Sequence, residues 1–376
     1  MATVTTGTYL GEPASASMAE IGVCAEVSPL PAGFPAKFER PLAWNGLEIK
    51  QEDYACVLTA SDLVEINAAI EYFKSLELDG SCVSRDTFPL PQLGLKLDKL
   101  GLDLYQGKGF CLVRGIKPEA YSVEDLTLVY LGVNSYIGGQ HGRQDGRGNM
   151  LVHIVADNSS STQAEHHRHS NKSISFHNEE SGDIVGWLTR NTAAKGGKCI
   201  IASAYTVYNV LAETRPDLIR ILARSDWPFA LPRFHCRPVI FHRDSNLVMN
   251  FGRTPLLGNT AHPRPETLPS LSERQIEALD AIEAIAQATQ LEITTQTGDM
   301  HFINNLAVLH RREAFVDGDQ AKRHLVRVRL RSPELGWELP EELQKEWDTA
   351  FSEEGNQTWH LEPMPSGYFP LRMYPN

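Results

Sequence analysis

The chain of 376 residues is 42% hydrophobic and 22% charged, proportions that indicate a folded globular protein and argue against a disordered one. Its formal net charge of -12 argues against a nucleic-acid partner, because phosphate binding needs a clustered positive surface. The six cysteines are scattered without a C-x-x-C pair, which argues against a zinc ribbon or a disulfide scaffold.

The N-terminal segment is rich in proline, glycine and alanine. Its first thirty residues lack both a basic start and a continuous apolar core, so neither a signal peptide nor a membrane anchor is predicted. We therefore expect a cytoplasmic protein with no membrane partner. Residues 1–45 are predicted to form an extended arm packed on the body, and residues 46–376 to form a single domain. The oligomeric state stays open, with a homo-oligomer among the alternatives.

The first part of the domain contains helical and extended patterns in turn. Apolar residues recur at helical spacing over residues 59–78, which open with Ser and Asp capping candidates, and this predicts an amphipathic helix. The run GKGFCLVRGI at 107–116 has the composition of a core strand between glycines. Residues 122–138 then return to a helical pattern.

A polar stretch with little periodicity occupies residues 154–176, directly before the first candidate metal ligand. We predict that it forms a lid-like insertion. It contains the run HHRH, from His166 to His169, which resembles a metal-binding tract. No cysteine or carboxylate follows at a fixed spacing, so we interpret this run as part of the lid or the surface.

Short apolar runs recur between turn-forming residues through the rest of the chain, which is typical of a sandwich or barrel of many short strands. These runs are DIVGWLT (183–189), KCIIAS (198–203), PVIF (238–241), NLVMNF (246–251), EITT (292–295), DMHFIN (299–304) and HLVRVRL (324–330). One helix is predicted among them at 271–290, with Ser272 or a neighbour as its cap. The fold class is therefore mainly β with flanking helices.

Two histidines and a carboxylate form a candidate metal site. A non-haem iron centre needs two neutral imidazoles and one carboxylate on one face of the metal. His177 and Glu179 are two residues apart, so on a strand their side chains point to the same face. His310 follows an apolar run far along the chain, and a distant strand can bring it to this pair. The sequence therefore predicts a metal site at these three residues.

Arginines alternate along the segment KRHLVRVRL, which places Arg323, Arg327 and Arg329 on one face of a predicted strand. Three cations are too many for an ordinary core face. A guanidinium group holds a carboxylate through two parallel hydrogen bonds, so Arg323 and Arg327 are candidates for carboxylate binding. A solvated edge strand is the alternative interpretation.

Several of these segments together resemble the taurine dioxygenase and 2,4-dichlorophenoxyacetate dioxygenase (TauD/TfdA) family, particularly its fungal members. The resemblance covers residues from about 107 to 340. It rests on the segments GKGFCLVRG, FHNEES, GGKCIIASAYTVYNVL, RPDL, GDMHFINNLAVLH and RHLVRVRLRSPELGWELP. It implies a double-stranded β-helix (jelly roll) core, and a dioxygenase that uses Fe(II), 2-oxoglutarate and O2.

The resemblance also implies roles for the two arginines. Arg323 would hold the 5-carboxylate of 2-oxoglutarate, and Arg327 an anionic group of the substrate. We expect C–H activation on a small carboxylate-bearing substrate, an amino acid or organic acid, in fungal secondary metabolism. Hydroxylation, desaturation and a cyclisation such as aziridine formation from valine are the alternative outcomes. Asn171 and Asn305 are further candidates for the substrate pocket.

Two positions depart from the family pattern. Most relatives have Asp where this chain has Glu179, so the neighbouring Glu180 is an alternative metal ligand. The position that often gives a hydroxyl group to 2-oxoglutarate is Cys199 here, and Ser203 is its possible substitute. Both residues are therefore candidates for binding the cosubstrate.

Two other functions fit part of the pattern. The same fold could hold zinc or another divalent ion and act as a hydrolase or isomerase, a chemistry that would not need Arg323. A catalytically silent binding protein would tolerate the loss of the histidines, the carboxylate and the arginine. The presence of all four residues favours the oxygenase.

Overall fold

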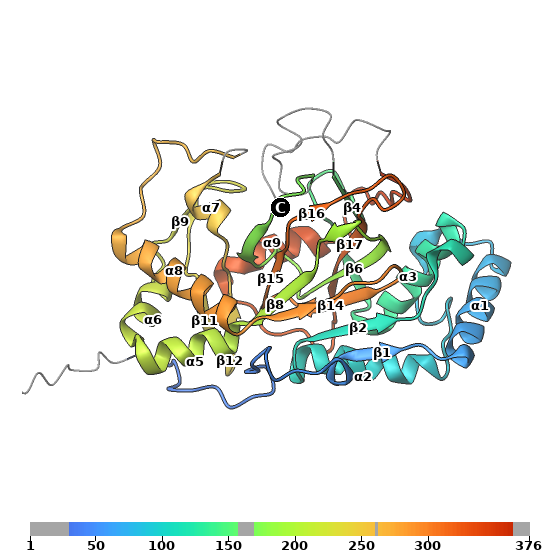
Figure 1. Ribbon diagram of the computed structural model, residues 1–376, viewed down its shortest axis with the longest axis horizontal. Helices are drawn as coiled ribbons and strands as arrows, with labels where there is room; N and C mark the ends of the chain where they lie inside the picture. The colour runs from blue at the N-terminus through green and yellow to red at the C-terminus, as the bar shows by residue number, and fades with distance from the viewer. Residues whose placement is uncertain (1–29, 157–168, 260–261, 364–376) are drawn as a thin grey trace, which may run out of the picture.

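The structure is a computed structural model that describes residues 30–156, 169–259 and 262–363. The chain folds into two main β-sheets with helices on both sides (Figure 1). Residues 30–45 run without helix or strand past α5 (Ala204–Thr214), where Phe38 packs edge-on against Tyr205 and Tyr208, with ring centroids 4.9 Å apart in both pairs. The rest of the predicted arm, residues 1–29, lies outside the described residues.

The larger sheet has seven strands in the order β1-β2-β14-β6-β17-β3, with β4 also paired to β17. These strands are β1 (Ala55–Val57), β2 (Phe110–Arg114), β3 (Gln140–Gly142), β4 (Val152–Val155), β6 (Ile184–Asn191), β14 (Met300–Asn304) and β17 (His324–Arg331). Their pairings are antiparallel except for that of β1 with β2, which is parallel. Strand β17 is internal, since it pairs with β6 on one side and with β3 and β4 on the other. The edge-strand interpretation of its arginines is therefore wrong.

The smaller sheet has four antiparallel strands in the order β13-β8-β15-β5. These strands are β13 (Leu291–Ile293), β8 (Cys199–Ser203), β15 (Val308–Arg312) and β5 (Ile174–His177). Three strand pairs stand apart: β7 (Lys195–Gly196) with β16 (Phe315–Val316), β9 (Pro228–Phe229) with β10 (His235–Cys236), and β11 (Ile240–Arg243) with β12 (Asn246–Met249). The strands predicted from the short apolar runs are thereby confirmed.

The two main sheets share a layer of buried side chains. Phe110, Val185 and Ile303 contribute to it from the larger sheet, and Ile201 and Val308 from the smaller one. Alternate residues of each strand point into this layer, which is how strands build the interior of a sandwich. This arrangement agrees with the predicted double-stranded β-helix.

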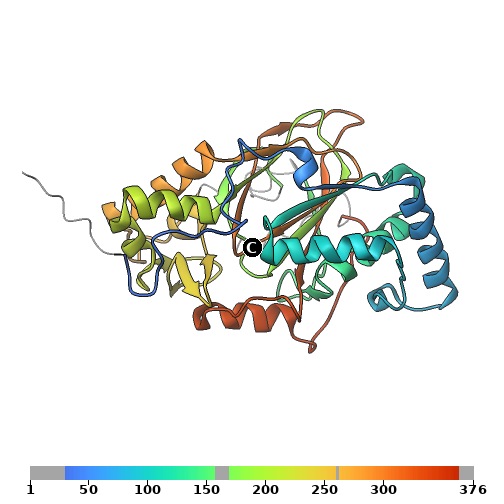
Figure 2. The ribbon, with the colours of Figure 1, turned by 90° about the horizontal axis from the view of Figure 1, so that it is seen from below.

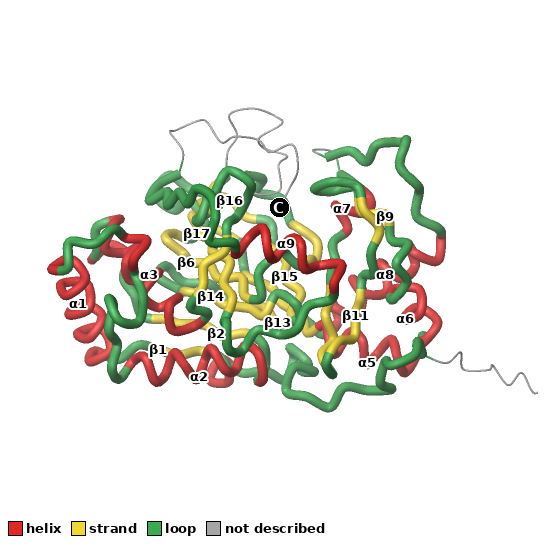
Figure 3. The backbone as a smooth tube through the Cα atoms, turned by 180° about the vertical axis from the view of Figure 1, so that it is seen from behind, coloured by secondary structure: helices red, strands yellow, loops and turns green. Residues whose placement is uncertain are grey.

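Helices flank the strands on both sides, as Figures 2 and 3 show. On the side of β1 and β2 lie α1 (Ala60–Ser75), α2 (Leu93–Gln106) and α3 (Val123–Ile137), and on the side of β8 lie α5, α6 (Pro216–Leu222) and α8 (Glu273–Ala288). The other helices are α7 (Arg253–Leu257), α9 (Glu341–Phe351) and the short 3-10 helices η1 (Gln51–Asp53), η2 (Gly80–Cys82) and η3 (Pro118–Ala120). Among the described residues, no helix has the length and apolar character needed to cross a membrane.

The helices predicted at 59–78, 122–138 and 271–290 are present, with caps that explain where they begin. Ser272 caps α8 as predicted, because its hydroxyl accepts a hydrogen bond from the backbone of Gln275. Helix α1 is capped by Thr59, whose hydroxyl accepts from the backbone N–H of Asp62 while the Asp62 carboxylate accepts from that of Thr59. The N-cap is therefore Thr59 and neither of the predicted Ser and Asp candidates, although Asp62 forms the second half of the capping box.

Both ends of the predicted lid-like insertion, residues 154–176, belong to strands: β4 ends at Val155 and β5 begins at Ile174. Residues 157–168 between them, including the first three of the HHRH run, lie outside the described residues. His169 is described, and it is buried with its Nδ1 atom 3.3 Å from the carbonyl oxygen of Val155.

Candidate metal centre

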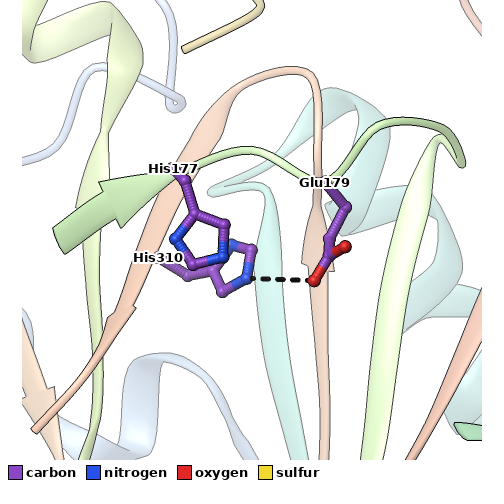
Figure 4. Close-up of side chains that lie close together, drawn as sticks. All are labelled: His177, Glu179 and His310. Carbon is purple, nitrogen blue, oxygen red and sulfur yellow. Dashed lines mark ion pairs between the residues drawn. The ribbon is translucent and has the colours of Figure 1, made fainter. Parts of the chain in front are cut away.

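Three predicted ligands come together at the end of β5. Strand β15 pairs with β5 so that His310 lies directly opposite His177, and Glu179 follows in the loop that leads to β6. The ligand atoms that these three residues offer lie within 4.8 Å of one another (Figure 4). Glu180, the alternative carboxylate, does not belong to this cluster. The structure therefore assembles His177, Glu179 and His310 from distant parts of the chain.

The loop after β5 corrects one detail of the prediction, because Glu179 is not on a strand. The backbone leaves the sheet after His177, where the N–H of Asn178 donates to the carbonyl oxygen of Phe251 at 2.8 Å. The side chain of Asn305 then fixes the next residue: its Oδ1 accepts from the Glu179 N–H at 2.8 Å, and its Nδ2 donates to the Glu179 carbonyl at 3.1 Å. Asn305 therefore holds the loop that carries the carboxylate, and it does not line the cavity beside these ligands.

Both imidazoles can offer a lone pair to a metal ion. The Nδ1 atom of His177 lies 2.9 Å from the carbonyl oxygen of Ser175, so Nε2 is the ring nitrogen that remains for a metal ion. Burial and the neighbouring His177 together lower the pKa of His310 to about 3, so this ring is neutral at neutral pH. Two neutral imidazoles and a carboxylate are the donor set of non-haem iron.

The Glu179 carboxylate is buried yet ionised. Burial alone would raise its pKa, but the guanidinium groups of Arg327 and Arg329 bring the pKa down to about 2. Arg327 donates a hydrogen bond from Nη1 to Oε1, and Nη2 of Arg329 lies 3.8 Å from Oε2. Oε1 also lies 3.9 Å from Nε2 of His310, while Oε2 has no hydrogen-bond partner among the described residues. The carboxylate thus keeps its charge and has an oxygen available for a metal ion.

A cavity of about 650 Å³, which we call the inner cavity, begins at these three side chains and runs between the two sheets. Its lining residues are Ile154, Ile174, His177, Glu179, Val185, Trp187, Lys198, Cys199, His310, Arg311, Arg312, Arg323, Leu325 and Arg327. Lysine and arginine supply five of them, whereas Glu179 is the one acidic residue in this described wall. The excess of positive charge favours an anionic ligand.

Arg323 contributes a buried guanidinium group to this wall. It is 8% exposed, and its side chain makes no ion pair and no hydrogen bond with any described residue. Burial lowers its pKa to about 10, so it stays protonated at neutral pH, and its guanidinium carbon lies 5.2 Å from the ring centroid of Phe315. The Cys199 thiol lies nearby in the same wall, and burial raises its pKa to about 12. An anionic ligand would supply the charge partner that Arg323 lacks in the described part of the chain.

Arg327 also reaches the inner cavity from β17. Its Nε donates to the side-chain oxygen of Gln144 at 3.1 Å, and its Nη1 donates to Glu179. Its Nη2 is buried and has no hydrogen-bond partner among the described residues. One N–H group of Arg327 therefore remains for a ligand.

Two predicted site residues lie away from this cavity. Ser203 is fully buried at the end of β8, where its hydroxyl donates to the Leu42 carbonyl and accepts from the backbone of Thr206, so it caps α5. Asn171 is exposed to solvent. Neither lines the inner cavity, so the structure does not support the predicted contact of Ser203 with the cosubstrate or of Asn171 with the substrate.

Three further residues belong to the site although sequence reasoning missed them. Trp187 lines the inner cavity from β6, Arg312 lines it from β15, and Gln144 accepts the hydrogen bond of Arg327. Trp187 carried a signal, because alternation along DIVGWLT places it on the same strand face as Val185. Arg312 carried one as well, since it lies two residues after His310 on β15. Gln144 lies in a segment without a motif.

Comparisons with known proteins place these observations in context. Residues 74–329 match the family model described as Taurine catabolism dioxygenase TauD, TfdA family. The chain is 34% identical over 348 residues to the taurine hydroxylase-like protein SAT17 of Stachybotrys chartarum, covering 88% of this chain and 89% of that protein. It is 24% identical over 318 residues to FR-33289 synthase of Streptomyces rubellomurinus, covering 80% of this chain and 91% of that protein.

Solved structures of similar fold include two oxygenases. Asparagine oxygenase in complex with Fe(II), 2S,3S-3-hydroxyasparagine and succinate aligns with a TM-score of 0.60 and 16% identity, covering 76% of this chain and 98% of that chain. The non-haem iron oxygenase OrfP in complex with Fe and alpha-ketoglutaric acid aligns with a TM-score of 0.54 and 16% identity, covering 74% and 93%. These likenesses confirm the predicted fold.

Proposed function

Because this chain belongs to the taurine catabolism dioxygenase TauD, TfdA family, we propose that His177, Glu179 and His310 bind the Fe(II) ion of its active site. Membership makes the chain a non-haem iron dioxygenase that uses Fe(II), 2-oxoglutarate and O2, so the predicted family and cofactors are confirmed. The donor set supports the proposed ligands: two imidazoles and an ionised carboxylate lie within 4.8 Å of one another.

We further propose that the inner cavity holds 2-oxoglutarate, a dianion with a carboxylate at each end. Arg323 would bind the far carboxylate, because it is a buried cation without an ion-pair partner among the described residues. Cys199 would lie beside that carboxylate, where relatives often have a hydroxyl group. The observation that carries this proposal is that one cavity contains both the metal ligands and the unpaired guanidinium group.

The substrate that we propose is a small amino acid or organic acid with a negatively charged group. The unused Nη2 of Arg327 supports an anionic group, since it is a buried donor beside the metal ligand Glu179. Asparagine oxygenase, which has the same fold, is bound to 2S,3S-3-hydroxyasparagine in its structure. OrfP, which also has this fold, is bound to (3S)-hydroxy-L-Arg. Hydroxylation, desaturation and ring closure, including aziridine formation from valine, are the outcomes we propose to test, and the setting we propose is fungal secondary metabolism.

The chain contributes to the reaction by holding and orienting the reactants. When bound, Fe(II) with 2-oxoglutarate and O2 supplies an oxidant that removes a hydrogen atom from a C–H bond, and 2-oxoglutarate ends as succinate and carbon dioxide. Arg327 and Arg329 keep Glu179 ionised, and the Ser175 carbonyl fixes the ring of His177. Arg323 would fix one end of the cosubstrate, which limits its motion relative to the metal ligands.

An anaerobic visible spectrum tests this assignment. Addition of Fe(II) and then 2-oxoglutarate should produce the weak metal-to-ligand charge-transfer band of a chelated keto acid. The band should be lost in His310→Ala and should need much more 2-oxoglutarate in Arg323→Ala. Arg311→Ala is the matched control, because Arg311 lines the same cavity but donates to the side chain of Gln290. Tight iron binding without such a band in the unmodified protein would overturn the proposed cosubstrate site.

A further inference from the structure

A second cavity borders two of the proposed metal ligands, and we call it the outer chamber. It has a volume of about 750 Å³ and shares Ile174, His177 and Glu179 with the inner cavity. Its remaining walls come from residues 178–180, from β9 and the turn after it, and from the segment that leads into α7. Helix α7 and β9 lie side by side in both Figure 1 and Figure 3. Two of the three proposed metal ligands, His177 and Glu179, therefore border both cavities.

Most of the outer chamber is apolar, as is usual where a small molecule binds. Phe229, Leu231 and Phe251 supply bulky apolar side chains to its wall. The charged side chains in this wall therefore decide which class of molecule it takes.

The two arginines of the outer chamber each have a carboxylate partner already. Nη1 of Arg237 lies 3.2 Å from Oε1 of Glu346, and Nη1 of Arg253 lies 2.7 Å from Oδ1 of Asp280. Their positive charges are thus balanced by residues that do not line the chamber. The chamber offers no unpaired cation among its described lining residues.

Glu180, unlike the two arginines, has no ion-pair partner among the described residues. Its side chain is only partly exposed and lines the outer chamber, yet no hydrogen bond or ion pair joins it to any described residue. It does not belong to the metal cluster either, although it follows Glu179 directly. Apart from that ligand, Glu180 is the acidic group that the described wall presents to the chamber.

We propose that the outer chamber holds the substrate, and that the Glu180 carboxylate binds a protonated amine of that substrate. The inference rests on the proposed function and narrows the substrate class to acids that also carry an amine. Both cavities have Glu179 in their walls, so the outer chamber lies directly beside the proposed metal ligands. The protonated amine would donate a charge-assisted hydrogen bond to the Glu180 carboxylate in a partly buried site. Such hydrogen bonds are among the stronger polar interactions in proteins.

Matched pairs of small molecules test this proposal without knowledge of the natural substrate. The protein is loaded with Fe(II) and 2-oxoglutarate under anaerobic conditions, and binding is measured by isothermal titration and by perturbation of the charge-transfer band. L-Valine is compared with 3-methylbutanoate, which lacks the α-amine, and L-lysine with L-norleucine, which lacks the side-chain amine. The first pair reports an α-amine and the second a side-chain amine.

We expect the unmodified protein to bind the amine-bearing member of at least one pair about tenfold or more tightly. Glu180→Gln should remove that preference, while Glu180→Asp should keep part of it. Glu353→Gln, at an exposed position outside both cavities, is the control and should behave as the unmodified protein does. Loss of the preference in Glu180→Gln together with an unchanged band would separate substrate recognition from metal binding and from misfolding.

Two results would overturn the proposal. One is the absence of any preference for an amine in both pairs, although the charge-transfer band forms. The other is a preference that Glu180→Gln retains. If the band fails to form in the unmodified protein, the proposed cosubstrate site itself is wrong and the inference falls with it. The band therefore distinguishes failure of the substrate assignment from failure of the proposed function.

Discussion

The side chain of Asn305 holds the backbone of Glu179 from both sides. It accepts from the Glu179 N–H at 2.8 Å and donates to the Glu179 carbonyl at 3.1 Å and to the Gly182 carbonyl at 3.0 Å. Asn305 is 1% exposed, so these bonds are shielded from water. A proposed metal ligand that lies in a loop is thus positioned by a side chain from the turn between β14 and β15.

We predict that Asn305→Ala weakens iron binding and destabilises the fold. The change leaves a buried N–H and two carbonyl groups without their partner, which should lower the free energy of unfolding by about 2 to 4 kcal/mol. Iron affinity should fall by about 10- to 100-fold, the range seen when a group that orients a metal ligand is removed. Urea unfolding and anaerobic Fe(II) titration measure the two effects.

The control for this change is Asn67→Ala, since the exposed Asn67 side chain accepts a single hydrogen bond from Tyr121. It should leave iron affinity unchanged. If Asn305→Ala lowered stability but bound iron as tightly as the unmodified protein, Asn305 would support the fold and have no role in positioning Glu179.

The sequence predicted the strands and the metal cluster because each leaves a local pattern, whereas the double-stranded β-helix followed from the family resemblance. Period-two apolar runs mark strands, and an H-x-E pair with a later histidine marks the cluster even though Glu179 lies in a loop. Cys199 and Ser203 show where such patterns fail. Both lie on the same face of β8, but they are four residues, or about 13 Å, apart along the strand. Only the fold shows that Cys199 reaches the inner cavity while Ser203 caps α5.

The polar residues around the metal ligands were harder to predict, because their roles depend on contacts between distant segments. Asn305 was expected in the substrate pocket since it lies close to His310 in sequence. Its amide instead meets the backbone of a loop 126 residues away. Arg237 and Glu346 form an ion pair beside the outer chamber, and no sequence pattern pointed to either residue. A pattern in one segment cannot show which second segment will lie opposite it.

Gly197 gives a second prediction, because it allows the chain to pass close to Arg323. Its φ is +78°, and an added Cβ would lie 3.3 Å from both Cδ and Nε of Arg323. Gly197→Ala should therefore displace the guanidinium group and weaken 2-oxoglutarate binding by about three- to tenfold. The strained backbone should also cost about 1 to 2 kcal/mol in the free energy of unfolding.

Gly33→Ala is a matched control for this backbone strain. Gly33 has a φ of +85°, but an added Cβ would meet nothing within 4 Å. It should lose stability to a similar extent and keep its affinity for 2-oxoglutarate, as measured by anaerobic titration of the iron-loaded protein. Equal affinities in the two variants would show that the close approach to Arg323 does not matter for binding.

Cys199 gives a third prediction. Its buried thiol is neutral and a weak hydrogen-bond donor, and it lies in the same wall as Arg323. Cys199→Ser should offer a stronger donor to the bound carboxylate and tighten 2-oxoglutarate binding by about two- to tenfold. Cys111→Ser, at a core cysteine outside the inner cavity, should leave that affinity unchanged. Unchanged binding in Cys199→Ser would place the cosubstrate away from this side chain.

Asp183 gives a prediction about pH, because it is a fully buried carboxyl group. Trp347 Nε1 donates to its Oδ1 at 2.6 Å, the Tyr105 hydroxyl donates to its Oδ2 at 3.3 Å, and Nε of Arg331 lies 3.7 Å from Oδ2. Burial outweighs these contacts and raises the pKa of Asp183 from 3.8 to about 6. The folded state therefore holds this proton more tightly than the unfolded chain does.

The sign of the effect on stability follows from that difference in pKa. The contribution of Asp183 is fully present below about pH 4, and it is lost as the pH rises through about 6, because the folded protein must then bury a charge. A pKa difference of about two corresponds to roughly 3 kcal/mol at neutral pH.

The Asp183→Asn variant tests this effect, because its side chain has no proton to lose and keeps an acceptor for Trp347. As the pH rises from 4 to 7, the variant should become more stable than the unmodified protein by up to that amount. Urea unfolding across this range measures the gain, with the exposed Asp86→Asn as the control. Parallel stability curves for Asp183→Asn and the unmodified protein would show that Asp183 is ionised at low pH in the folded state, with its buried charge balanced by Arg331.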